Sequence, residues 1–238
     1  MAKATFFDNI ADASGFRSLS AFFNALEPFS FEVTASNEVV FTASNDLTMV
    51  LTGTGFAGDD EGLSTGNIKS VNFFNAEGDK LATVSDISIA AAVFSDRLNE
   101  TDTTSVFLDL AFKGKDVHRA SDLGDELFAG KGDDRLIGGD GVDSLSGGRG
   151  RDKLSGGDGM DLFYFTKGDG RDVILDFDAV GGFNEQDFVG VDNDMVADAT
   201  IRKSGKHDTL VDFGDGDSIL FKGVRPGQID KFDDMADF

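Results

Sequence analysis

Four consecutive nine-residue units carry the residues in this sequence that are best suited to bind a metal ion. The units read AGKGDDRLI, GGDGVDSLS, GGRGRDKLS and GGDGMDLFY, and they fill residues 129–164. Each unit has an aspartate at its sixth position and glycines at its second and fourth positions. Glycine allows backbone angles that other residues avoid, so each unit can turn tightly and present carbonyl oxygens. Because carbonyl and carboxylate oxygens are the ligands that Ca²⁺ prefers, the units predict calcium-binding loops.

An apolar residue at the eighth position of every unit indicates how the units pack. In the second and third units it stands between polar residues, in SLS and KLS, as expected for a short strand with one inward-pointing side chain. One unit alone buries too little apolar surface, so the units must stack. A flexible glycine-rich linker would not keep this apolar residue. The preceding residues 120–128 keep Asp125 and Leu127 without the glycine pattern, which indicates a degenerate first repeat.

The motif GGxGxDxUx resembles the repeat of the RTX family of secreted calcium-binding bacterial proteins. This resemblance implies a right-handed parallel β-roll with two repeats per coil and about three to five calcium ions between stacked loops. It places Asp125, Asp143 and Asp161 along one side of the roll, and Asp134 and Asp152 along the other. Each ion would take one aspartate from each of two loops, together with backbone carbonyls. The residues expected at the calcium sites are Asp125, Gly130, Gly132, Asp134, Gly138, Gly139, Gly141, Asp143, Gly147, Gly148, Gly150, Asp152, Gly156, Gly157, Gly159, Asp161 and Asp172.

The segment after the repeats is similar to the end of RTX domains. The string GDGRDVILDF at 168–177 resembles the sequence that follows the last nonapeptide in such proteins. Asp169 and Asp172 either close the last calcium site or belong to a solvated turn that caps the roll. Residues 199–224 predict a three-stranded meander and resemble the cap and secretion region of serralysin-type RTX proteins.

Residues 1–118 predict a β-rich module whose ligand the sequence does not name. Candidate strands lie at 29–33, 38–42, 46–52, 67–75, 80–85 and 105–112, because apolar and polar residues alternate there. Residues 87–98 favour a helix, and Leu19, Phe22, Phe23 and Leu26 have helical spacing before Pro28. The expected fold class is therefore mostly all-β. A sandwich-like module at 1–118 precedes the β-roll at 119–178 and a cap with a secretion signal at 179–238.

Composition limits the classes of partner. The chain of 238 residues has 44 acidic and 21 basic side chains, a net charge of −23 and no cysteine. Nucleic acids and anionic membranes are poor partners for such an acidic surface, whereas cations and neutral or basic ligands suit it. No disulfide or thiolate site exists. No N-terminal signal peptide or membrane span is evident, so we expect an extracellular protein that leaves a bacterium by type I secretion, as RTX proteins do.

The sequence contains no zinc-protease motif. There is no HExxH string, and we expect His118 and His207 to lie on the surface. The cluster Asp59, Asp60 and Glu61 suits an acid/base pair, a second calcium site or an exposed acidic turn.

The sequence therefore predicts a non-enzymatic binding or adhesion protein. It would fold when calcium binds after export and would contact polysaccharide or a cell surface through its N-terminal module. The alternatives are a small polysaccharide-modifying enzyme and a structural component of a surface layer or matrix. Its expected partners are calcium and the type I secretion machinery.

Overall fold

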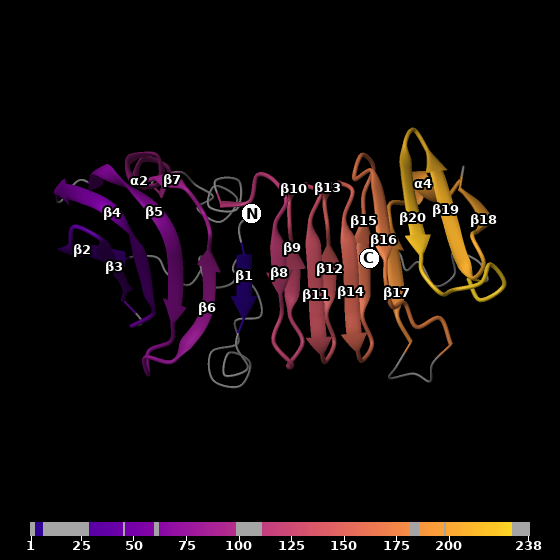
Figure 1. Cartoon of the computed structure of the whole chain (residues 1–238). Coiled ribbons are helices and arrows are strands. Elements are labelled where there is room, and N and C mark those ends of the chain that lie inside the picture. Colours follow the sequence, from indigo (N-terminus) through magenta and orange to yellow (C-terminus); the bar gives the residue numbers. More distant parts are fainter. Residues whose placement is uncertain are drawn as a thin grey trace. The chain divides into compact units, whose positions relative to one another are not determined.

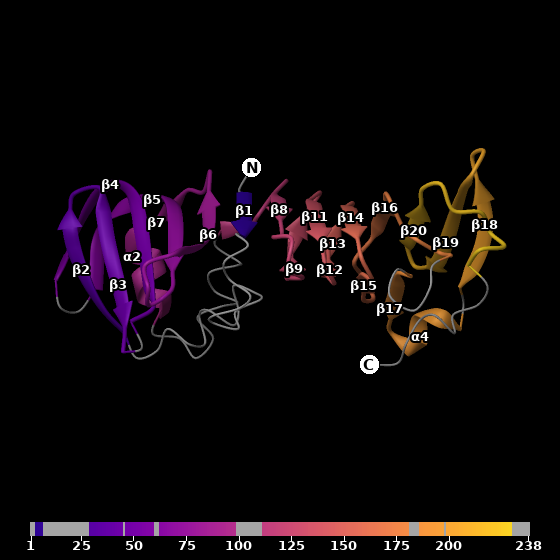
Figure 2. The same cartoon turned by 90° about the horizontal axis from the view of Figure 1, so that it is seen from below.

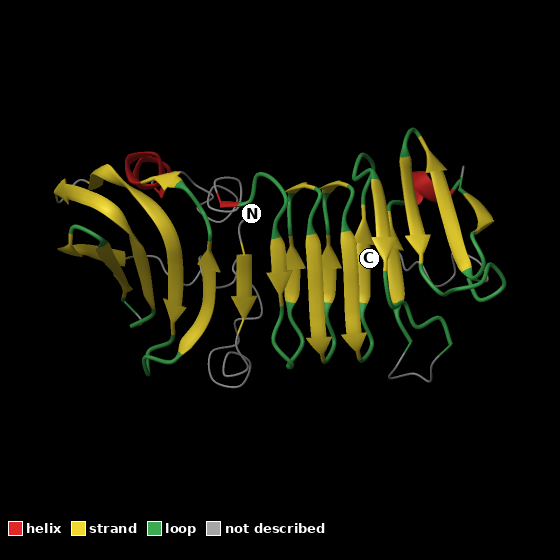
Figure 3. Cartoon of the chain, viewed as in Figure 1, coloured by secondary structure: helices red, strands yellow, loops and turns green. Residues whose placement is uncertain are grey.

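Strands dominate the computed structural model of the chain (Figure 3). The chain divides into two compact units, residues 1–113 and 114–238. The expected boundary after residue 118 falls inside a strand of the second unit, and 179–238 is not separated from the repeats. The residues that the structure describes are 3–6, 29–44, 46–59, 62–98, 111–180, 186–197 and 199–229.

The first unit is an antiparallel sheet in the order β1-β6-β5-β4-β3-β2 (Figure 1). Its inward side chains alternate along each strand as the sequence predicts, with Val39, Phe41, Met49 and Leu51 almost fully buried. A short strand and a helix follow and pack on β5. The elements are β1 (Lys3–Phe6), β2 (Phe29–Ala35), β3 (Glu38–Ala43), β4 (Thr48–Asp59), β5 (Gly62–Phe74), β6 (Lys80–Ser85), β7 (Ile89–Ala90) and α2 (Ala91–Leu98).

This unit differs from the expected sandwich, because its described strands form one sheet rather than two facing sheets. The helix α2 supplies apolar cover instead. Its Phe94 meets Phe41 of β3 edge to face, with ring centroids 6.3 Å apart. A helix within 87–98 is thus confirmed.

Several predictions for the first unit fall on residues that the structure does not describe. Residues 105–110 of the expected strand lie outside the described ranges, and Ala111 at its end is helical rather than extended. The expected helix with Leu19 and Phe22 also lies outside the described residues, as do Asp60 and Glu61.

The second unit begins with a parallel β-roll that has two main sheets and a third sheet of two short strands. Strands one coil apart pair in register, so that Leu136 lies beside Leu154 and Leu145 beside Phe163. Each coil therefore contains two repeats, and the parallel fold is confirmed. One sheet has β8 (Val117–Arg119), β11 (Arg135–Asp140), β14 (Lys153–Asp158) and β16 (Arg171–Ile174); the other has β9 (Glu126–Phe128), β12 (Ser144–Ser146), β15 (Leu162–Phe165) and β17 (Phe188–Val191); β10 (Lys131–Gly132) pairs with β13 (Arg149–Gly150).

The eighth positions of the repeats fill the interior of the roll. Leu136, Leu145, Leu154 and Phe163 are all 0% exposed. The expectation that His118 lies on the surface is wrong, because His118 is 2% exposed and pairs in register with Leu136. It occupies the eighth position of a further degenerate repeat at 111–119. His207 lies on the surface, as expected.

A three-stranded antiparallel cap closes the far end of the roll (Figure 2). It consists of β18 (Thr200–Ser204), β19 (Asp208–Gly214) and β20 (Asp217–Phe221), and a short helix α4 (Asn193–Val196) precedes it. Strand β20 pairs in parallel with β16, and Phe221 packs edge to face on Phe177 at 5.0 Å. The cap thus covers an edge of the sheet that would otherwise be open to another chain.

Candidate calcium sites

Eight aspartates at the starts of the strands of the roll form two hydrogen-bonded ladders. At each step, a backbone N–H donates to Oδ1 of the aspartate one coil further along. For example, Asp134 N lies 2.7 Å from Asp152 Oδ1, and Asp125 N lies 2.6 Å from Asp143 Oδ1. One ladder contains Asp116, Asp134, Asp152 and Asp172, and the other contains Asp125, Asp143, Asp161 and Asp187.

The four inner aspartates each keep one carboxylate oxygen without a hydrogen-bond donor. The Oδ2 atoms of Asp134, Asp143, Asp152 and Asp161 are buried, and none has a hydrogen-bond partner. These side chains are at most 2% exposed, so solvent does not supply the missing donors. A buried carboxylate oxygen without a partner is costly, and a bound cation would satisfy it.

The first glycine of a unit leaves room beside that oxygen. A Cβ atom on Gly147 would lie 2.4 Å from Asp152 Oδ2, and one on Gly156 would lie 2.0 Å from Asp161 Oδ2. Any larger residue would therefore fill the space that the oxygen faces. In the described residues no three His, Cys, Asp or Glu side chains converge in a metal-binding group. Backbone carbonyls must therefore supply most of the oxygens around an ion.

The glycines at the second and fourth positions bring such carbonyls close together. A Cβ atom on Gly157, whose φ is +109°, would lie 2.0 Å from the carbonyl oxygen of Gly139 one coil below. The same holds for Gly159 over Gly141, at 1.7 Å. Only glycine permits both the positive φ and this approach. The repeated glycines therefore determine how closely the loops stack.

Burial of the ladders disfavours their charged form. It raises the pKa of Asp134 and Asp161 to about 7, and that of Asp143 and Asp152 to about 6. Hydrogen bonds from the backbone oppose this rise, and neighbouring carboxylates add to it. The pKa of Asp172 is raised furthest, to about 8, again mainly by burial. Carboxylate oxygens without hydrogen-bond partners, negative charge and stacked carbonyls together fit a hard divalent cation such as Ca²⁺.

At three ladder ends, the protein itself supplies donors to the second carboxylate oxygen. Asp125 Oδ2 accepts hydrogen bonds from the backbone N and the hydroxyl of Ser121, at 2.6 and 2.7 Å. Asp187 Oδ2 accepts one from Asp178 N at 2.8 Å, and Asp116 Oδ2 one from Gly114 N at 3.3 Å. These aspartates lack the unpartnered oxygen that marks the inner four.

The structure also places residues that sequence reasoning missed. Asp116 and Asp187 belong to the ladders although neither is among the expected site residues. The signal for Asp116 is its position nine residues before Asp125, with Gly114 at the fourth place of its unit. No comparable signal marks Asp187, which follows Asp161 by 26 residues.

The two aspartates that were expected at the end of the repeats have separate positions. Asp172 joins the first ladder and accepts a hydrogen bond from Asp152 N at 2.8 Å. Asp169 instead accepts hydrogen bonds from the backbone N and hydroxyl of Thr166, in the loop between β15 and β16.

Comparison with known proteins agrees with this geometry. Residues 120–154 and 137–174 match the family model of the RTX calcium-binding nonapeptide repeat, with four copies. The chain therefore carries RTX repeats, which bind Ca²⁺, and the four repeats suit several ions. No curated protein matches the chain. Among the described residues, no helix has the length and apolar character that crossing a membrane requires.

Proposed function

We propose that this chain is an exported calcium-dependent binding protein whose roll folds when calcium binds. The observation that carries the proposal is the set of four buried Oδ2 atoms without hydrogen-bond partners. Without a cation, these charges oppose folding of the roll, and glycine adds a further entropic cost. With calcium, the free energy of binding becomes free energy of folding.

The inner aspartates Asp134, Asp143, Asp152 and Asp161 are the proposed calcium ligands, with Asp172 as a fifth. Backbone carbonyls of the glycine-rich loops complete each site. Calcium supplies the positive charge that lets these carboxylates stay ionised in the interior. Asp125 has the role of a ladder end, because Ser121 already donates to its Oδ2.

This calcium dependence suits export by type I secretion, the typical route of RTX proteins. Calcium is scarce inside a bacterial cell, so the repeats remain unfolded and can pass through a channel. Extracellular calcium modules have dissociation constants of about 10⁻⁴ to 10⁻³ M, so calcium outside the cell would fill the sites. The folded roll would then support a non-enzymatic role in binding polysaccharide or a cell surface.

Far-ultraviolet circular dichroism of the full chain tests the folding step. The strand signal should be weak in chelator and should rise cooperatively as calcium is added. Magnesium is the matched control, because it demands a tighter octahedral geometry and keeps its water ligands. Spectra that are the same in chelator and in calcium would contradict the proposal. Binding of the calcium-loaded chain to a glycan array tests the adhesive role, which fails if no glycan is bound.

A further inference from the structure

The two flanks of the roll differ in charge although both are built from the same nine-residue repeat. On one flank, the third, fifth and seventh positions of the repeats carry exposed basic side chains except at Val117 and Asp133. We call these basic side chains the basic stripe. The same positions on the other flank carry the exposed acids Asp122, Glu126, Asp140 and Asp158, or small and apolar residues. The basic stripe consists of Lys115, Lys131, Arg135, Arg149, Arg151, Lys153 and Arg171.

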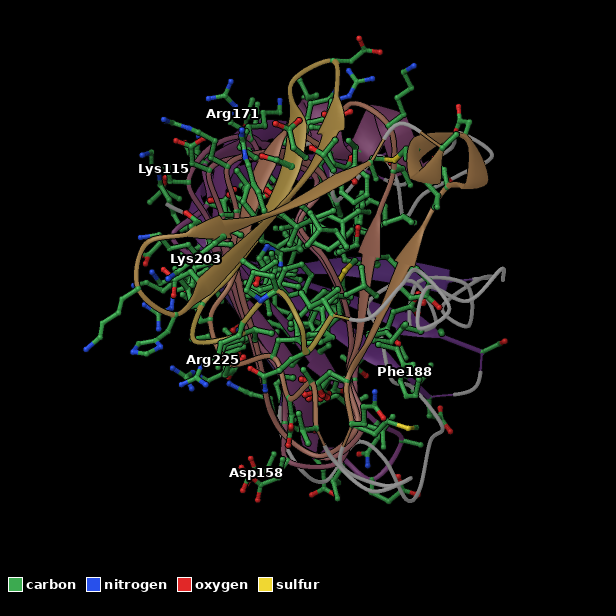
Figure 4. All side chains as sticks on the ribbon, turned by 90° about the vertical axis from the view of Figure 1, so that its right-hand side faces the viewer. Lys115, Asp158, Arg171, Phe188, Lys203 and Arg225 are labelled. Carbon is green, nitrogen blue, oxygen red and sulfur yellow. The ribbon has the colours of Figure 1, made fainter. Side chains whose placement is uncertain are left out.

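The stripe is ordered in rows by the register of the roll. Arg135 lies beside Lys153 in the paired strands β11 and β14, and Lys131 lies beside Arg149 in β10 and β13. Strand pairing separates such neighbours by about 4.8 Å. Figure 4, which looks along the roll, shows Lys115 and Arg171 on one side and Asp158 at the bottom. Positive charges therefore repeat along the roll at nearly constant spacing.

Few acidic groups of the protein neutralise this stripe. Asp133 pairs with Arg151 at 2.8 Å and with Lys115 at 3.3 Å. Within the described part of the chain, the remaining five cations form no salt bridge, including none to the buried aspartate ladders. The stripe therefore does not serve to balance the calcium-site carboxylates.

We propose that the basic stripe binds a linear anionic polysaccharide. Regular rows of exposed cations complement a polymer that carries a negative group in each sugar unit, and the length of the stripe allows several contacts at once. The overall charge of −23 disfavours anionic partners elsewhere on the surface and so confines them to this flank. The inference rests on the proposed function only in that the roll must be folded by calcium.

Binding of the calcium-loaded full chain to labelled dextran sulfate tests this proposal, with neutral dextran of equal length as the reference. We expect binding to dextran sulfate that weakens with added salt, and none to dextran. An oligogalacturonate arm distinguishes sulfate from carboxylate recognition, and binding of either polymer supports the proposal. Binding to neither polymer, or equal binding to dextran, would overturn it, as would tighter binding to duplex DNA.

A matched pair of variants separates the stripe from net charge. The double variant Arg135→Gln and Lys153→Gln lacks two cations of the stripe. Its binding to dextran sulfate should be about tenfold weaker, as expected for the loss of two exposed ion pairs. The double variant Lys69→Gln and Lys80→Gln lacks two exposed cations of the first unit. Its binding to dextran sulfate should stay within about twofold of that of the unmodified chain. Equal losses in both variants would overturn the proposal. Calcium-induced circular dichroism of each variant shows separately whether the roll has folded, so failure of calcium folding is distinguishable from failure of the stripe.

Discussion

Replacing Asp143→Asn should reduce the calcium dependence of folding, because Asp143 combines burial, charge and an unpartnered oxygen. Burial raises its pKa from 3.8 to about 6. One pKa unit corresponds to about 1.4 kcal/mol, so the charged side chain opposes folding by about 3 kcal/mol near neutral pH. An asparagine keeps the acceptor for Asp125 N but still buries an amide, at a cost of about 1 kcal/mol or more. In chelator, the variant should therefore be more stable by about 1–2 kcal/mol.

In calcium, the same variant should be less stable than the unmodified chain. A site at a calcium concentration 100-fold above its dissociation constant adds about 2.7 kcal/mol to the free energy of unfolding. Loss of the charged ligand removes most of this increment. Tyr164 lies in β15 of the roll and is the only tyrosine in a chain without tryptophan. Urea unfolding followed by tyrosine fluorescence therefore reports on the roll alone within the full chain.

Asp125→Asn is the matched control for this experiment. Asp125 belongs to the same ladder, but Ser121 donates two hydrogen bonds to its Oδ2. Its replacement should lower stability by about 1–2 kcal/mol equally in chelator and in calcium, because charge-assisted hydrogen bonds are lost in both. Asp143 is not a calcium ligand if both variants reduce the calcium increment to the same extent, or if Asp143→Asn leaves it unchanged.

Three further results are expected. Without calcium, the roll should gain stability as pH falls from about 8 to 4, because Asp134, Asp161 and Asp172 have raised pKa values. The folded state therefore binds more protons than the unfolded state in this pH range. A strand signal in circular dichroism that weakens in chelator on acidification to pH 5 would contradict this prediction. Gly157→Ala should lower the free energy of unfolding by more than about 2 kcal/mol, because its Cβ would meet the loop one coil below. Gly168→Ala has open space around its Cβ and should lower the free energy of unfolding by about 1 kcal/mol. Equal losses in urea unfolding would show that loop stacking does not explain the need for glycine at 157. Ser121→Ala should lower stability by about 1 kcal/mol in calcium and in chelator alike, and an effect seen in calcium alone would disprove a capping role for Ser121.

The roll could be predicted from sequence because ligands and packing repeat with the same period. Every unit between 129 and 164 needs glycine where loops stack, aspartate where charge is required and an apolar residue inside. The three kinds of residue recur with the same period of nine, so each supports the same prediction of the fold. The division of the aspartates into two groups follows from the coil of two repeats, and the hydrogen bonds between Asp134 and Asp152 and between Asp125 and Asp143 show it.

The ends of the roll were harder to predict because their residues depart from the pattern. His118 fills an inward position that apolar residues hold elsewhere, and burial lowers its pKa to about 4, so it is neutral there. A sequence search for an apolar eighth residue therefore misses the first coil and Asp116. Asp187 follows an insertion, and its place beside Asp161 depends on strand pairing between β15 and β17.

The individual strands of the first unit could be predicted, but the way they assemble into a single sheet could not. Strand β3 lies within one residue of its expected range, because its inward and outward residues alternate cleanly. Strands β4 and β5 extend well beyond the expected 46–52 and 67–75 ranges, since register shifts near Gly53 and Gly58 interrupt the alternation. Nothing in local alternation decides whether a second sheet or a helix covers the buried face.

Net charge does not describe how charge is distributed over the roll. A value of −23 averages over the whole surface, whereas the roll separates basic and acidic positions onto different flanks. The separation of charge is visible in the sequence only when every second repeat is aligned, because repeats one coil apart lie on the same flank.

Hydrogen exchange of the full chain, measured by mass spectrometry in chelator and in calcium, tests calcium-dependent folding most directly. We expect amides in β11, β12, β14 and β15 to exchange rapidly in chelator and to become protected in calcium. Amides in β3, β4 and β5 of the first unit should change little, which provides an internal reference. Equal protection of the roll strands in both conditions would contradict the claim that calcium folds the roll.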